Sequence, residues 1–149
     1  MFSHQYIKMC IEGREDIEYV RVYNSTKGGW LGKFTFKKGD YFNHSKIGED
    51  EVREVAQVGK SNLRAVDDPW PYRKEDCIWI PTADQLAKEA QQLPYALHKE
   101  AAKDYYKLQN HVLSTLSNEE QVLSYWMEKK CGKLWDFENQ KWIKIGTKD

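Results

Sequence analysis

The sequence has no long hydrophobic run. No stretch approaches the about 18 consecutive apolar residues that a membrane-spanning helix needs. Residues Met1 to His4 do not open a basic and then apolar leader. We therefore expect neither membrane insertion nor secretion, no membrane partner, and residence in the cytoplasm.

The motifs of common metal centres and nucleotide-binding folds are also missing. The three cysteines lie far apart with no Cys-x-x-Cys, and the histidines form no His-x-x-x-His pair. The glycines form neither a P-loop nor a Gly-x-Gly-x-x-Gly motif. The sequence thus names no metal ligand, no cofactor site and no catalytic residue, and we expect Cys10, Cys77 and Cys131 to be buried free thiols.

The chain does have enough apolar and aromatic residues for a core. Of its 149 residues 40% are hydrophobic, with six Trp and nine Tyr. A chain of this length can bury roughly 68–70% of the surface that its unfolded form exposes. Its 23 basic and 23 acidic residues cancel, which argues against a duplex DNA binder because such proteins carry a broad positive field. The composition predicts a folded, soluble protein.

Residues 1–80 consist of short β-prone runs separated by turn residues. The predicted strands span residues 5–11, 17–23, 30–37, 41–42, 51–58 and 62–66, and the first two would form a hairpin. The phrase Phe36–Phe42, which contains a Lys-Lys-Gly-Asp turn, resembles the opening of SH3-like small barrels. We predict a bent antiparallel sheet, with an SH3-like barrel as one form of it, and a rigid two-proline loop over residues 67–72.

Residues 81–149 follow a helical period. Thr82 with Gln85, and Ser117 with Glu120, can each form a reciprocal capping box at a helix start. We predict three helices over residues 83–93, 97–116 and 118–131, the last ended by Gly132, and a terminal hairpin over residues 134–145. The β-rich half and the helical half, residues 1–80 and 81–149, would pack as one compact α+β unit.

Two segments carry a resemblance to known proteins. They are Ile78–Leu86 and Trp126–Asp136, with Lys141-Trp142 downstream. Together they resemble small uncharacterised proteins encoded by phages and prophages of Gram-positive bacteria, which pair an aromatic-Ile/Leu-Pro helix start with a Lys-x-Trp-Asp…Trp ending. No activity is established for that group. The resemblance implies an accessory protein that acts on a host component, in the cytoplasm of the host cell.

Aromatic residues in Gly- or Pro-rich loops are candidates for protein binding. Trp and Tyr dominate binding hot spots, and Trp30, Trp70 and Tyr72 lie in or beside such loops. The first hypothesis is a non-catalytic protein that binds a host protein through an exposed apolar patch around Trp70 and Tyr72. The structural alternative is that these rings fold back and cap the core.

The alternative function is nucleic-acid or small-nucleotide binding by residues 27–42. Lysines would contact phosphates while an aromatic ring stacks on a base. The candidates are Trp30, Lys33, Lys37, Lys38 and Tyr41. The structural alternative is a strand whose aromatic residues face the core and whose lysines face water.

Enzyme activity is left open by one group of acids. A hydrolase would require Asp67, Asp68 and Glu75 to converge in a cleft. Carboxylates in loops are usually just solvated, so we expect a binding protein rather than an enzyme.

Overall fold

The computed structural model describes residues 2–24, 29–30, 34–48, 51–89, 106–107 and 116–144. The chain has a mixed α+β structure, as the sequence predicts. Its helices are α1 (His4–Glu12), α2 (Arg14–Val22), α3 (Ala83–Glu89) and α5 (Asn118–Trp126), with a 3-10 turn η2 (Lys74–Asp76) and a π-helical turn η4 (Met127–Cys131). Its strands are β1 (Tyr23–Asn24), β2 (Gly29–Trp30), β3 (Tyr41–Asn43), β4 (Arg53–Val58), β5 (Asn62–Ala65), β6 (Pro71–Arg73), β7 (Ile78–Trp79), β8 (Lys133–Asp136) and β9 (Lys141–Lys144).

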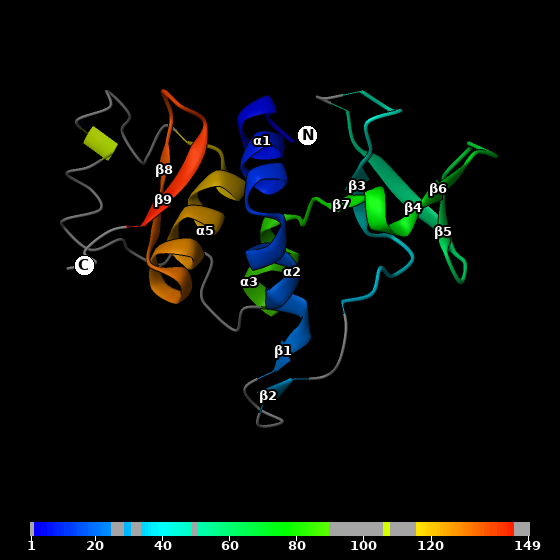
Figure 1. Ribbon diagram of the computed structural model, residues 1–149, viewed down its shortest axis with the longest axis horizontal. Helices are drawn as coiled ribbons and strands as arrows, with labels where there is room; N and C mark the ends of the chain where they lie inside the picture. The colour runs from blue at the N-terminus through cyan, green and yellow to red at the C-terminus, as the bar shows by residue number, and fades with distance from the viewer. Residues whose placement is uncertain are drawn as a thin grey trace.

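The elements form three groups along the longest axis of the molecule (Figure 1). A five-stranded antiparallel sheet, β3 to β7, lies at one end, and α5 with the β8–β9 hairpin lies at the other. Helices α1, α2 and α3 stand between them. In the part of the chain that the structure describes, no helix has the length and apolar character needed to cross a bilayer.

The predicted hairpin over residues 5–11 and 17–23 is wrong, because these segments form α1 and α2. Ser3 caps α1, since its hydroxyl accepts a hydrogen bond from the amide of Tyr6 at 3.0 Å. Each helix also has an ion pair between side chains four residues apart. The apolar residues of such short segments fit a period of two as well as 3.6, so burial of the helical face against the core decides between them.

The antiparallel sheet has the strand order β6-β5-β4-β3-β7. Strands β4 and β5 lie where the sequence predicts them, and their register shifts between Val55 and Gln57. A register shift of this kind bends a strand. Strands β6 and β7 are the two edges of this sheet and, within the described residues, do not pair with each other. The structure therefore shows the antiparallel sheet, and the SH3-like barrel stays a prediction.

Two predicted segments of the first half differ from the structure. Residues 34–37 are not a strand: the rings of Phe34 and Phe36 pack edge to face at 5.0 Å, and Phe34 also lies against Trp79. Contacts between aromatic rings, rather than hydrogen bonds to a neighbouring strand, therefore fix the position of this segment. The predicted loop over residues 67–72 ends at Trp70, because Pro71 begins the edge strand β6, a position that tolerates proline.

The predicted reciprocal capping box at Thr82 is confirmed, and the one at Ser117 is confirmed in one direction. The Gln85 amide donates to the Thr82 hydroxyl at 3.1 Å, and the Thr82 amide donates to the Gln85 side chain at 3.0 Å. The Glu120 amide donates to the Ser117 hydroxyl at 3.2 Å, but within the described residues the Glu120 carboxylate accepts from the Ser3 hydroxyl at 2.7 Å and not from the Ser117 amide. Gly132 ends η4 with a φ of 64°. The β8–β9 hairpin is also confirmed. The predicted helix over residues 97–116 lies almost entirely outside the described residues.

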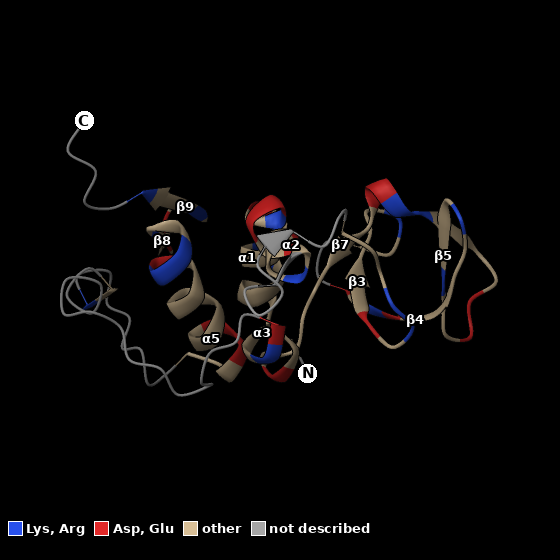
Figure 2. Ribbon diagram, turned by 90° about the horizontal axis from the view of Figure 1, so that it is seen from below, with Lys and Arg blue, Asp and Glu red and all other residues tan. Residues whose placement is uncertain are grey.

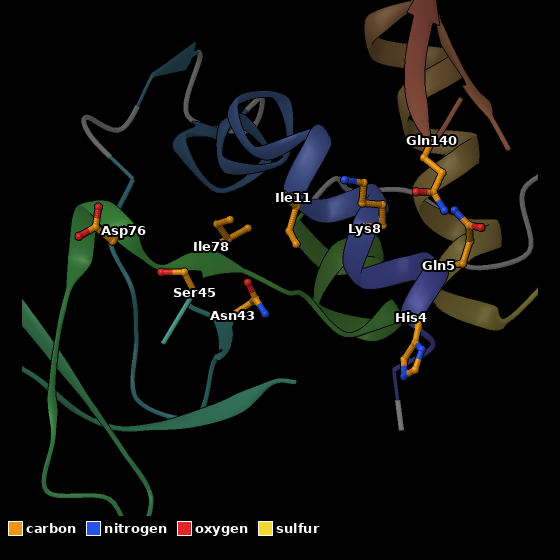
Figure 3. Close-up of a pocket in the computed structure, with 9 residues that line it drawn as sticks. All are labelled: His4, Gln5, Lys8, Ile11, Asn43, Ser45, Asp76, Ile78 and Gln140. Carbon is orange, nitrogen blue, oxygen red and sulfur yellow. The ribbon is translucent and has the colours of Figure 1, made fainter. Parts of the chain in front are cut away.

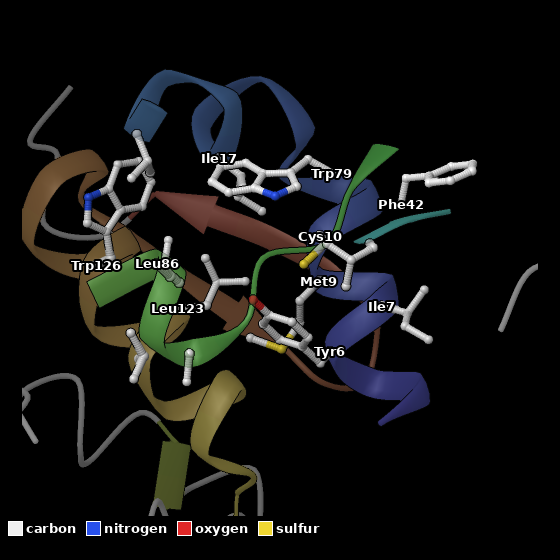
Figure 4. Packing of buried hydrophobic residues seen from close by; sticks show 14 of the residues in the cluster. Tyr6, Ile7, Met9, Cys10, Ile17, Phe42, Trp79, Leu86, Leu123 and Trp126 are labelled. Carbon is white, nitrogen blue, oxygen red and sulfur yellow. The ribbon is translucent and has the colours of Figure 1, made fainter. Parts of the chain in front are cut away.

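One hydrophobic cluster joins the three groups of elements (Figure 4). It includes Tyr6 of α1, Trp79 of β7, Leu86 of α3 and Trp126 of α5. The hydroxyl of Tyr6 donates to the carbonyl of Pro81 at 2.6 Å, which ties α1 to the chain just before α3. Residues from both predicted halves therefore share one core.

Candidate functional site

The loop between β5 and β6, Val66 to Trp70, is ordered by the side chain of Asp68. Its Oδ1 accepts a hydrogen bond from the Trp70 amide at 2.9 Å, and its Oδ2 accepts one from the Tyr72 hydroxyl at 2.5 Å. The Asp68 amide donates to the carbonyl of Ala65 at 3.2 Å. Asp commonly fixes turns through such local hydrogen bonds. The loop is therefore ordered before any partner binds.

Apolar side chains of this loop face the solvent. Trp70 is 52% exposed, and Val66 and Pro69 are exposed beside it in the chain. The ammonium group of Lys46 lies 5.0 Å from the centre of a Trp70 ring, which is within cation–π range. We call Val66, Pro69 and Trp70 the Trp70 patch.

Tyr72 does not belong to this surface, although we predicted from the sequence that it would be exposed beside Trp70. Its side chain is 6% exposed, and its ring lies 5.5 Å from that of Phe42 and 5.1 Å from that of His44. Successive residues of a strand face opposite sides, so Tyr72 of β6 faces the core while Pro71 and Arg73 face water. The prediction of an exposed side chain is therefore wrong for Tyr72. The exposed large hydrophobic residues of this loop are Val66 and Trp70.

The hydrogen bond between Asp68 and Tyr72 changes the proton affinity of both groups. Donation from the Tyr72 hydroxyl, together with the Trp70 amide, lowers the pKa of Asp68. The same hydrogen bond, together with desolvation, raises the pKa of Tyr72. Near neutral pH the loop therefore holds an ionised Asp68 and a neutral Tyr72, the pair of charge states that this hydrogen bond requires.

A cavity of about 510 Å³ lies between α1 and the sheet (Figure 3). Helix α1 contributes His4, Gln5 and Lys8 to its lining, and the sheet side contributes Asn43 and Asp76. The Gln5 side-chain nitrogen is buried and has no hydrogen-bond partner among the described residues. An imidazole, an ammonium and a carboxylate together can orient a small polar ligand, but the lining does not select one chemical class.

A buried ion pair between Arg21 and Asp40 ties α2 to the turn before β3. The Arg21 guanidinium donates to both carboxylate oxygens of Asp40, and the two side chains are only 7% and 3% exposed. Asp40 also accepts hydrogen bonds from the Lys37 amide at 2.8 Å and from the Gln85 side chain at 3.1 Å. No sequence motif marks this pair, since its partners are distant in sequence. We interpret it as structural.

The residues predicted to bind nucleotides are only partly described. For Trp30 the structure describes only the backbone, which forms part of β2. Lys33 lies outside the described residues. Lys37 and Lys38 are exposed, and the Lys37 ammonium lies 3.9 Å from a Glu89 carboxylate.

The ring of Tyr41 is not available as an open stacking platform. It packs edge to face against the ring of Phe2 at 5.4 Å, and its side chain is half-buried. Neither this ring nor Lys37 or Lys38 lines the cavity beside α1. The described members of the predicted nucleotide site are therefore not gathered around that pocket.

In the described part of the chain, no hydrogen bond or shared ion-pair partner joins the acids considered for a hydrolase. Asp68 is held within its loop, Glu75 forms an exposed ion pair with Arg73, and Asp67 occupies a turn with a φ of 59°. Within the described residues, no group of three or more His, Cys, Asp or Glu is placed to hold a metal ion.

The cysteines have the character of structural thiols. Cys10 and Cys77 are buried and Cys131 is half-buried. Burial raises the pKa of Cys77 to about 12 and that of Cys131 to about 11. Nucleophilic thiols have lowered pKa values. Cys77 and Cys131 therefore do not have the environment of a catalytic nucleophile.

Comparison with known proteins assigns no family. No protein-family model, no curated protein and no solved structure matches the chain significantly. These comparisons therefore supply no function for the chain.

Proposed function

We propose that this chain is a non-catalytic accessory protein that binds a host protein through the Trp70 patch. The observation that carries the proposal is the 52% exposure of Trp70 in a loop that Asp68 holds in one conformation. An ordered loop loses little conformational freedom on binding. An indole can bury a large area in a partner's pocket, which makes Trp a frequent hot-spot residue.

The distribution of exposed apolar side chains supports the same surface. Among the described residues, the large hydrophobic side chains that are exposed are Tyr19, Val58, Val66 and Trp70. Two of the four lie in one five-residue loop, and Trp70 is the most exposed. A partner that covers the loop would remove both from water in a single contact.

The chemistry of the described residues supports binding rather than catalysis. The carboxylate of Asp68 is engaged within the loop, and burial raises the pKa of Cys77 and of Cys131. The resemblance to phage-encoded proteins is the reason for proposing a bacterial host protein as the partner.

The test is affinity capture from extracts of Gram-positive bacteria with three immobilised forms of the chain. They are the wild type, Trp70→Ala and the matched control Tyr19→Ala, which truncates an exposed aromatic residue of α2. We expect one protein to bind the wild type and the control, and to bind Trp70→Ala at least about tenfold more weakly, as for a hot-spot residue. Equal retention by all three forms, or no specific partner, would contradict the proposal.

A further inference from the structure

A second cavity, of about 430 Å³, lies on the outer face of the sheet. Its central residue is Arg64 of β5, which pairs in register with Gln57 of β4 on one side and with Pro71 of β6 on the other. The turn between β4 and β5 brings Lys60 to the same cavity. Pro71 lines the cavity and directly follows Trp70 in the chain, so the two features are one residue apart where the edge strand of the sheet begins.

Every charged residue that lines this cavity is basic. Lys60 and Arg64 are the two cations, and Gln57, Ser61 and Asn62 add polar side chains. Basic positions on and beside β5 are blue in Figure 2. Neither Lys60 nor Arg64 makes an ion pair within the described part of the chain.

The neighbouring Arg73 differs in this respect, because it pairs with Glu75. Arg73 lies opposite Asn62 in the β5–β6 register, so it shares the outer face with the cavity. The sheet therefore presents, within the described residues, two cations with no internal ion-pair partner next to one whose charge is already balanced.

We propose that this cavity binds carboxylate side chains of an acidic segment in the partner protein that covers the Trp70 patch; the inference thus rests on the proposed function. An Arg guanidinium can bind a carboxylate through two parallel hydrogen bonds, and a Lys ammonium adds a second positive charge. The chemistry predicted for the partner is an acidic side chain close to an apolar pocket.

The surroundings of the cavity favour an acidic protein segment over a nucleic acid. A nucleic-acid surface carries a broad positive field. Here the exposed acids Glu54 and Asp67 lie close by in the chain, at β4 and at the start of the Trp70 loop. A site with two cations matches one or two carboxylates rather than a run of phosphates.

The experiment selects peptides from a displayed random library on four immobilised forms of the chain. They are the wild type, the double variant Lys60→Gln/Arg64→Gln, Trp70→Ala, and the control Lys130→Gln, which removes an exposed charge from η4 at the other end of the molecule. Circular dichroism establishes that each form is folded. We expect the wild type and the control to enrich peptides in which Asp or Glu accompanies apolar residues, and the double variant to lose the acidic excess.

A synthetic copy of an enriched peptide gives the magnitude. Its affinity for the double variant should fall about tenfold, the size expected for two exposed ion pairs near their upper range. The same peptide with Asp and Glu changed to Asn and Gln should bind the wild type about as weakly. It should lose nothing more on the double variant, because the charges then have no counterpart.

The outcomes separate this inference from the proposed function. Peptides that need Trp70 but show no acidic excess would overturn the inference and leave the proposed function standing. Acidic peptides that need Lys60 and Arg64 but bind Trp70→Ala normally would support the cavity and contradict the Trp70 patch as the anchor. Enrichment of no peptide would contradict both. Binding of a labelled oligo-dT that the double variant loses would assign the cavity to nucleic acid and overturn the inference.

Discussion

Asp40→Ala should be among the most destabilising single changes in the described core. The carboxylate accepts hydrogen bonds from two nitrogens of Arg21, from the Lys37 amide and from the Gln85 side chain. Arg21 is only 7% exposed, so water cannot replace the lost partner. The substitution would leave the buried guanidinium with Glu89 as its remaining carboxylate partner among the described residues.

The expected loss is about 3 kcal/mol in the free energy of unfolding, the lower end of the range for breaking a buried ion pair. The lower end applies because Arg21 keeps a hydrogen bond to Glu89 at 3.2 Å. For a chain of this length a loss of this size lowers the midpoint of thermal unfolding by about 6–12 °C.

The assay is urea unfolding followed by circular dichroism, with Glu75→Gln as the control. Glu75 belongs to an ion pair with Arg73 in which both side chains are more than 60% exposed. An exposed pair is typically worth under about 1 kcal/mol. If Asp40→Ala cost no more than Glu75→Gln, the interpretation of Arg21 and Asp40 as a buried structural pair would be refuted.

Three further predictions concern packing and titration. Gly13→Ala should cost about 1–3 kcal/mol through overpacking, because its Cβ would lie 2.9 Å from the Trp142 indole nitrogen; thermal unfolding measures the loss, and Trp142→Phe should recover part of it. Burial lowers the pKa of His44, so its contribution to stability is complete above the unfolded value of about 6.5 and is lost as the pH falls through the folded pKa. The free energy of unfolding, measured with urea between about pH 5 and 8, should therefore change less with pH in His44→Asn than in the wild type. Burial raises the pKa of Cys77 and of Cys131, to about 12 and about 11, so at pH 8 both thiols should react with Ellman's reagent at least about tenfold more slowly than in denaturant, and Cys77 more slowly than Cys131.

Each of these predictions has an opposing result. A Gly13→Ala protein as stable as the wild type would show that the contact with Trp142 relaxes freely. An unchanged pH dependence in His44→Asn would mean that another group controls acid stability. Rapid labelling of Cys77 in the native protein would contradict its burial.

Features with a local cause could be predicted from the sequence. The caps at Thr82 and Ser117 and the stop at Gly132 depend on residues at most three positions apart, and the chain contains all of that chemistry. The β4–β5 hairpin and the terminal hairpin have turn residues between β-prone runs.

Features with a tertiary cause could not be predicted in this way. The segments that form α1 and α2 have apolar residues compatible with either period, and the helical form is favoured because it buries Tyr6 and Ile17 in the shared core. The exposure of Trp70 and the burial of Tyr72 depend on where β6 begins. The sequence does not identify Lys60 and Arg64 as a possible binding site, because only the register of β4, β5 and β6 brings them to one cavity.

The most direct test of the Trp70 patch places a photo-crosslinking benzophenone side chain at position 70 or, as the control, at position 19 in α2. Both positions are exposed, so neither replacement places the probe in the core. We predict that illumination in bacterial cells joins the position-70 form to one defined host protein and that the position-19 form gives no such product. Crosslinks of equal yield and identity from both positions, or none from position 70, would contradict the assignment of Trp70 as the anchor of a protein-binding surface.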